Sequence, residues 1–217
     1  GSVASNQPPL GFELSDPDVA DTVKYRVVIS LAADFATAVV DYTSALAAQG
    51  AKTFTVGQAA GSGTYATGSE SQTLADGSYY WRVKAIDNSA AESSYATANS
   101  GSVAFIVDTD TPDVVSVTSS SANGTYGVGS VIPIQITFSE AVTVSGTPQI
   151  GLATGTPANT YIDYSSGSGT NTLTFNYTVA SGNISADLDY TAVSSLGLNS
   201  GTINDAAGNA AVLTLAT

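Results

Sequence analysis

The chain has 217 residues, and its 18 acidic and five basic side chains give a net charge of −13 at neutral pH. This charge disfavours nucleic acid and anionic membrane surfaces as partners, because affinity for phosphate depends on clustered Lys and Arg. With no histidine and no cysteine, the chain has no Ser-His-Asp or Cys-His catalytic arrangement, no ligand set for a soft metal and no disulfide.

The composition predicts an all-β protein, since it is rich in Gly, Ser, Thr, Ala, Val and Tyr and poor in helix formers. The length fits two sandwich domains, of which residues 1–110 are expected to form the first. Apolar and polar residues alternate at 23–29 and 79–85, which is the period of half-buried strands. The other predicted strands are 10–14, 37–42, 52–56 and 102–107, and turn-rich stretches lie at 59–68 and 87–99.

The run Gly77-Ser78-Tyr79-Tyr80-Trp81-Arg82-Val83 resembles the strand of fibronectin type III-like domains that carries Tyr and Trp. The resemblance implies a fibronectin III-like or cadherin-like sandwich for residues 1–110. Its alternating neighbours predict that Trp81 belongs to the core and is not a carbohydrate platform.

Residues 111–217 are expected to form the second sandwich. Its predicted strands, separated by Gly, Ser, Thr and Asn turns, are 114–117, 131–138, 148–152, 160–164, 172–179, 195–198 and 211–215. Two of its runs are Ile134-Gln135-Ile136-Thr137-Phe138-Ser139-Glu140-Ala141-Val142 and Asn204-Asp205-Ala206-Ala207-Gly208-Asn209. With 108–112, 120–128, 146–150, 173–179 and 187–190, these runs resemble, in order, the Ig-like repeats of large calcium-dependent bacterial surface adhesins of the biofilm-associated, RTX type. The resemblance implies two tandem Ig-like or fibronectin III-like Greek-key β-sandwiches in an array of repeats.

An acidic run, Asp108-Thr109-Asp110-Thr111-Pro112-Asp113, joins the two parts. From residue 85 to residue 217 the chain has ten carboxylates and no Lys, Arg or His, so acids that meet there either repel one another or share a divalent cation. Calcium is the expected cofactor, because it takes about six to eight oxygen ligands in a flexible geometry. In the resembling repeats, linker and loop acids bind calcium. Carried over residue by residue, the expected ligands are Asp108, Asp110, Glu140 and Asp205.

A second group of acids lies at corresponding places in the first part. The run 12–18 aligns with 137–142, and 87–92 aligns with 205–209. The second set of candidate calcium ligands is therefore Asp16, Asp18, Asp21 and Asp87. Neither group has the central Gly and closing Glu of an EF-hand loop. The alternative for both groups is turn chemistry, since Asp and Asn side chains cap nearby backbone amides.

Four basic residues, Lys24, Arg26, Arg82 and Lys84, are expected to share one face of two adjacent strands with Tyr80. We interpret this cationic stripe as a solvated face paired with Asp41 and its neighbours. The alternative is a site for a sulfate or carboxylate of a glycan.

The sequence predicts a protein that is not an enzyme. Paired carboxylates hydrolyse glycosides only in a cleft with sugar-stacking aromatics, and here the acids lie in loops at the sandwich ends. The predicted function is that of calcium-stiffened spacer modules of a bacterial adhesin, secreted or on the cell surface. Expected partners are neighbouring repeats and, through other domains, a host or biofilm surface, and the fragment itself is expected to be monomeric. The alternative function is a carbohydrate-binding or other ligand-binding module of an adhesin or polysaccharide-active enzyme.

Overall fold

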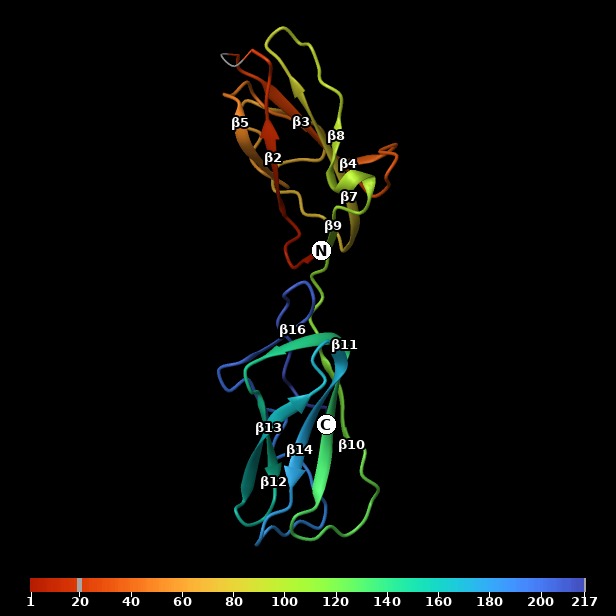
Figure 1. Ribbon diagram of the computed structural model, residues 1–217, viewed down its shortest axis with the longest axis vertical. Helices are drawn as coiled ribbons and strands as arrows, with labels where there is room; N and C mark the ends of the chain where they lie inside the picture. The colour runs from red at the N-terminus through yellow and green to blue at the C-terminus, as the bar shows by residue number, and fades with distance from the viewer. Residues whose placement is uncertain (19–20, 217) are drawn as a thin grey trace. The chain divides into compact units, whose positions relative to one another are not determined.

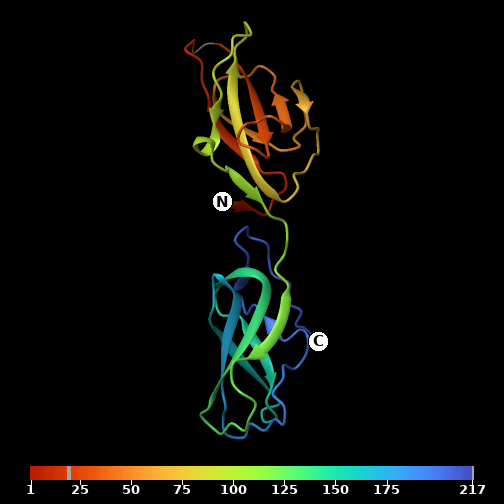
Figure 2. The same cartoon turned by 90° about the vertical axis from the view of Figure 1, so that its right-hand side faces the viewer.

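The computed structural model shown in Figures 1 and 2 describes residues 1–18 and 21–216, and Val19, Ala20 and Thr217 lie outside the described residues. The chain is 47% strand and 2% helical, which confirms the predicted all-β class. It divides into two compact units, Gly1–Thr109 and Asp110–Thr217. The division falls one residue before the predicted boundary. Among the described residues, no helix has the length and hydrophobicity needed to cross a bilayer.

The first unit contains one large sheet and one two-stranded sheet. The large sheet has the order β1-β9-β7-β3-β4-β6, with β8 also paired to β7, and β2 pairs with β5 in the small one. The strands are β1 (Ser2–Val3), β2 (Pro9–Leu14), β3 (Lys24–Ser30), β4 (Ala38–Thr43), β5 (Gly50–Thr55), β6 (Thr64–Thr67), β7 (Gly77–Ile86), β8 (Ala96–Thr97) and β9 (Phe105–Val107), and a short 3-10 turn covers Ala98–Gly101. The short strands β6 and β8 lie in stretches that the sequence predicts as turns.

The core of the first unit lies between these two sheets, so the unit is a sandwich. Val27 and Ile29 on β3 and Phe54 on β5 are fully buried. Phe12 on β2 packs edge-on against Tyr25 on β3, with ring centroids 4.9 Å apart, a favourable aromatic geometry. Trp81 also packs against this core while partly exposed, as its alternation predicts.

The strands of the second unit form a sheet of order β10-β11-β14-β13-β12-β15, with β16 also paired to β11. They are β10 (Val114–Ser119), β11 (Val131–Ser145), β12 (Gln149–Ala153), β13 (Asn159–Ser166), β14 (Thr170–Thr178), β15 (Leu196–Gly197) and β16 (Thr202–Asn204). The predicted strand 211–215 is wrong, because that segment contributes only an isolated bridge between Val212 and Asp113.

The long strand β11 organises this unit. Its first part pairs with β10 and β14, its last part, Thr143–Ser145, pairs with β16, and the register with β14 shifts between Thr137 and Val142. Alternate residues Ile136 and Phe138 are buried, so the first part of the strand faces the core with a period of two. Because β11 pairs with β14 up to residue 142 and with β16 from residue 143, the segment 139–142 is held close to β16.

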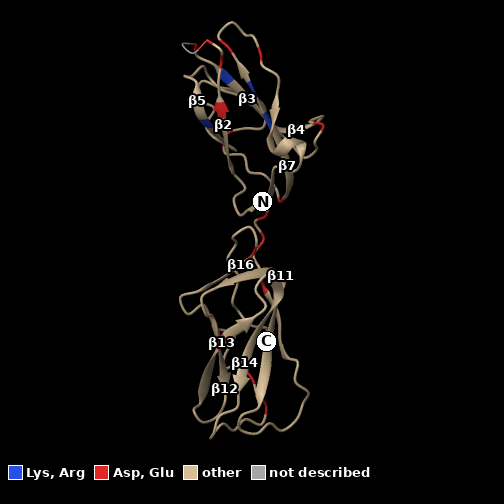
Figure 3. Cartoon of the chain, in the orientation of Figure 1, with Lys and Arg blue, Asp and Glu red and all other residues tan. Residues whose placement is uncertain are grey.

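Figure 3 shows the uneven distribution of charge between the units. All five Lys and Arg residues precede residue 85 and therefore lie in the first unit. Acids of the second unit have no basic side chain of their own unit available as a counter-charge.

Candidate functional site

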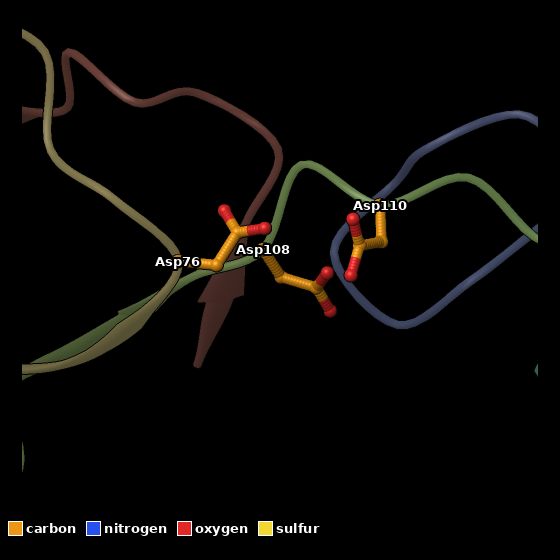
Figure 4. A group of neighbouring side chains, drawn as sticks. All are labelled: Asp76, Asp108 and Asp110. Atoms are coloured by element: carbon orange, nitrogen blue, oxygen red, sulfur yellow. The ribbon is translucent and has the colours of Figure 1, made fainter.

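Two carboxylates lie together at the end of the first unit where the chain leaves it. The strands β7 and β9 pair Gly77 with Val107, so Asp76 and Asp108 continue that antiparallel register by one position. A carboxylate oxygen of Asp76 and one of Asp108 lie within 4.8 Å of each other, and Figure 4 shows the two side chains next to each other. The chain exit therefore carries two acids that directly flank paired strands of the sheet.

Hydrogen bonds anchor this exit. The backbone N–H of Thr109 donates to Asp76 Oδ1 over 3.0 Å, the hydroxyl of Thr109 donates to the same oxygen over 3.0 Å, and the N–H of Asp108 donates to the carbonyl of Val3 over 3.1 Å. Asp76 thus caps the outgoing backbone. Asp110, the next acid along the chain, is exposed and begins the second unit.

The entrance of the chain into the second unit is anchored in the same manner. The N–H of Asp113 donates to Ser139 Oγ over 3.0 Å, and the N–H of Ser139 donates back to the carbonyl of Asp113 over 2.8 Å. The carbonyl of Pro112 accepts from the N–H of Val212 over 2.8 Å. The incoming chain is therefore fixed next to Glu140, which directly follows Ser139.

Glu140 and Asp205 form the acid pair of the second unit, with carboxylate oxygens within 4.8 Å of each other. Asp205 is only 5% exposed. Its Oδ1 accepts the N–H groups of Gly208 at 2.6 Å and Asn209 at 2.8 Å, and its Oδ2 accepts the side-chain amide of Asn209 at 2.7 Å. These contacts fix the orientation of the carboxylate.

The same contacts set its charge. Burial alone would raise the pKa of Asp205, but the hydrogen bonds from the Asn209 side chain and from the amides of Asn209 and Gly208 outweigh burial and lower the pKa below its ordinary value. The group is thus ionised at neutral pH, the state that a metal ligand requires.

The loop after Asp87 in the first unit repeats the geometry of the loop after Asp205. In each, the Asp N–H donates over 3.0 Å to the carbonyl four residues on, to Ala91 or to Asn209. In each, the N–H of that fourth residue donates to the Asp Oδ1, at 2.7 and 2.8 Å respectively. The third residue, Ala90 or Gly208, has positive φ in both loops. Both are the same capped hairpin, at the positions that the sequence aligns.

The pKa of Asp87 is lowered, mainly because the Ser89 side chain donates a hydrogen bond to its carboxylate. Asp16 and Asp18 also act in a turn, where the N–H of Asp18 donates to Asp16 Oδ1 over 2.9 Å. The carbonyls of Asp18 and Asp21 accept from the Gln49 amide at 2.9 and 3.4 Å. Among the described residues, none of these four candidate acids falls in a group of three carboxylates close enough to share an ion.

The donor set at the linker fits a hard cation. Its ligand atoms are carboxylate oxygens, which suit calcium, and the chain has no His or Cys to favour zinc. Asp205 Oδ2 accepts the side-chain amide of Asn209, and a carboxylate oxygen has two lone pairs, so this contact does not by itself prevent metal coordination. A metal held by one pair alone would need further oxygens from backbone carbonyls or water.

A shallow hollow of about 290 Å³ also lies on the second unit. Tyr161 is its one aromatic lining residue and is 63% exposed. Its ring lies along the backbone of Gly151, where an added Cβ would meet Tyr161 Cε1 at 3.1 Å. The remaining lining residues are small or uncharged and polar: Gln149, Thr191, Ala192, Ser194, Ser195, Gly197 and Asn199.

Asp76 is the site residue that the sequence interpretation missed. The signal was the pairing of two predicted strands, 79–85 and 102–107, because extending their antiparallel register places Asp76 opposite Asp108. A scan against protein-family models and a search of curated proteins both give no match to this chain. The resemblance to adhesin repeats therefore stays a prediction.

Proposed function

We propose that the chain is a pair of non-enzymatic spacer modules of a bacterial cell-surface adhesin, and that calcium bound by linker and loop acids stiffens the joint. The observation that carries the proposal is that both ends of the linker are tied to acid pairs. Thr109 is hydrogen-bonded to Asp76 in the first unit, and Asp113 is hydrogen-bonded in the second unit to Ser139, the residue before Glu140.

The linker between these anchors is short. Only Asp110 and Thr111 separate Thr109 from Pro112, and three Cα–Cα steps span at most about 11 Å. Covalent connectivity thus limits how far apart the two ends of the linker can lie. A flexible linker otherwise permits bending, because interfaces between such modules are usually too small to fix an angle.

Repulsion between the carboxylates is the energy that a bound calcium ion would remove. Two carboxylate charges 4.8 Å apart repel by about 1 kcal/mol in water and by about 3–4 kcal/mol at an effective dielectric of 20. A divalent cation replaces this repulsion with attraction, and no Lys, Arg or His beyond residue 84 can do so. Under the proposal, Asp108, Asp110, Glu140 and Asp205 supply the charge, with Asp76 as an added contributor.

Small-angle scattering tests the mechanical role. In millimolar calcium the wild-type pair should give a narrow distribution of maximum dimensions, and in EDTA a broader one. The double variant Asp108→Ala/Asp110→Ala should stay broad in both. An Asp187→Ala variant is the matched control, since this exposed acid lies in neither pair. If the distribution of maximum dimensions of the wild type is the same in calcium and in EDTA, the proposal is refuted.

A carbohydrate-binding module is the second candidate, favoured by the exposed Tyr161 ring and the uncharged polar lining of the hollow. A single aromatic gives less stacking area than a groove with several, so we rank this function below the spacer. Binding of a neutral oligosaccharide that Tyr161→Ala abolishes, together with no calcium effect on the scattering, would reverse the ranking.

A further inference from the structure

The cationic stripe of the first unit is not uniform. Arg26 forms a bidentate ion pair with Asp41, with donor–acceptor distances of 2.8 and 2.6 Å, which confirms the predicted pairing with Asp41. Lys84 pairs with Glu92 and is 8% exposed, so this part of the face is covered and not solvated as predicted. Between them, Arg82 is ion-paired with no carboxylate among the described residues.

Arg82 lies instead against two aromatic rings. Its guanidinium carbon lies 4.4 Å from the ring centroid of Phe35 and 4.1 Å from that of Tyr95. The two rings come from different loops, the one after β3 and the one before β8. They stack on the guanidinium by cation–π attraction, which leaves its in-plane edge for a ligand.

Two further features concern Arg82 and Phe35: an unpaired donor and a strained backbone. Arg82 Nε is buried and has no hydrogen-bond partner, so the donors left for a ligand are those of the two terminal nitrogens. Phe35 has φ of 56°, a conformation that a bulky side chain adopts only at a steric cost. The fold therefore maintains a strained residue whose ring immobilises the arginine.

We propose that Arg82, Phe35 and Tyr95 form a carboxylate-binding slot. A guanidinium edge presents two parallel N–H donors that match the two oxygens of a carboxylate. A planar carboxylate can align both of its oxygens with one guanidinium edge, whereas a tetrahedral sulfate places only part of its oxygens in that plane. Stacking fixes the side chain beforehand, so binding loses less rotamer freedom than at a free arginine.

The local charge supports an anionic ligand in spite of the acidic chain. The face carries four positive residues, Lys24, Arg26, Arg82 and Lys84. The acids beside it are Asp41 and Glu92, which are paired, and Asp34, which precedes Phe35 in the adjoining loop, so the local balance is +1 (four minus three). The local charge therefore favours a carboxylate here more than on the acidic remainder of the chain. The slot uses none of the proposed calcium ligands, so it does not depend on the spacer function.

Nuclear magnetic resonance on the full chain tests the slot directly. The chain has two arginines, so two side-chain Nε–H signals are expected, and Arg26→Lys assigns them. D-galacturonate and N-acetylglutamate amide are titrated at constant ionic strength, with D-galactose and sulfate as matched probes. The Arg82 signal should shift and saturate at roughly 10 mM carboxylate, the range open to one charge-assisted contact, while the Arg26 signal stays fixed.

Variants separate binding from packing. Arg82→Lys keeps the positive charge but loses the two parallel N–H donors of the guanidinium, so the affinity for carboxylate should fall about tenfold. Phe35→Gly removes one ring and relieves the positive φ, so affinity should fall several-fold in a folded protein. Lys24→Gln removes a charge of the same face outside the slot and should change affinity less than about twofold.

The stronger of the two carboxylates identifies the ligand source as a sugar acid or an acidic side chain, and either result supports the slot. Three results would overturn it: no shift of the Arg82 signal with either carboxylate at about 100 mM, sulfate binding as tightly as carboxylate, or unchanged affinity in Phe35→Gly. The wild-type comparison of galacturonate with galactose decides the matter even where a variant fails to fold.

Discussion

Replacing Asp205 by alanine is expected to destabilise the second unit even without calcium. The nearly buried carboxylate accepts three hydrogen bonds from Gly208 and Asn209. Hydrogen bonds to charged groups contribute about 1.5–3 kcal/mol each, but these three belong to one loop and are not additive, so the loss should be about 2–4 kcal/mol. For a unit of this size the melting temperature should fall by roughly 10–25 °C.

Under the proposal, calcium adds a second, separable contribution to stability. Ligands drawn from a linker and two loops should bind calcium with Kd of about 10⁻⁴ to 10⁻³ M, as in extracellular modules. At about 10 mM calcium, mass action then stabilises the folded unit by about 1.4–2.7 kcal/mol, or roughly 6–15 °C. Asp205→Ala should remove most of this calcium-dependent shift in addition to its basal cost.

Calorimetry in calcium and in EDTA measures both contributions. Trp81 is the only tryptophan, so its fluorescence assigns the transition of the first unit and leaves the other transition to the second. Asp163→Asn is the matched control, because this exposed acid on β13 lies in neither acid pair; it should retain the calcium shift. The reasoning fails if wild type shows no shift, or if Asp205→Ala keeps the full one.

Two further predictions concern stability alone. The pKa of Asp205 in the folded protein is lowered from 3.8, so the stabilisation by its ionised form is present above about pH 4 and is lost as the pH falls through the folded pKa. In urea unfolding, the stability difference between wild type and Asp205→Asn should therefore shrink below about pH 4. A difference that stays constant with pH would contradict this. Gly167→Ala should cost about 2–4 kcal/mol of stability, because φ is 108° and the new Cβ would lie 2.1 Å from the carbonyl oxygen of Thr172. In the control Gly169→Ala, the new Cβ meets no atom within 4 Å, so the cost should be about 1 kcal/mol. Equal losses of stability in chemical denaturation would refute the steric argument.

Period-two patterning accounts for the strands that the sequence predicts well. Strands β3 and β7 lie within a residue or two of their predicted limits, because each alternates apolar and polar residues over a half-buried surface. The full length of β11 could not be predicted. Its later part, Thr143–Ser145, is stabilised by pairing with β16, and such long-range pairing leaves little signal in the local sequence.

The sequence interpretation grouped Glu140 with Asp205, which the structure brings together, but it left out Asp76. The shortage of cations drew attention to these acids, and the resemblance to adhesin repeats singled out Asp108 and Asp205 as expected ligands. Asp76 could not be identified in this way, because its approach to Asp108 depends on the register between β7 and β9. Register is a tertiary property, set by which strand faces bury together.

Turn chemistry and metal binding are not exclusive readings of these acids. The amide hydrogen bonds that cap the 205–209 loop also hold the Asp205 carboxylate ionised and fixed in orientation, which is what outer contacts do for a ligand in a metal site. Asp87 has the same cap, but both of its carboxylate oxygens also accept from Ser89. The two loops thus share one backbone design and differ in how much of the carboxylate remains for a cation. A capped Asp becomes a useful ligand only where a second acid approaches it, as Glu140 approaches Asp205.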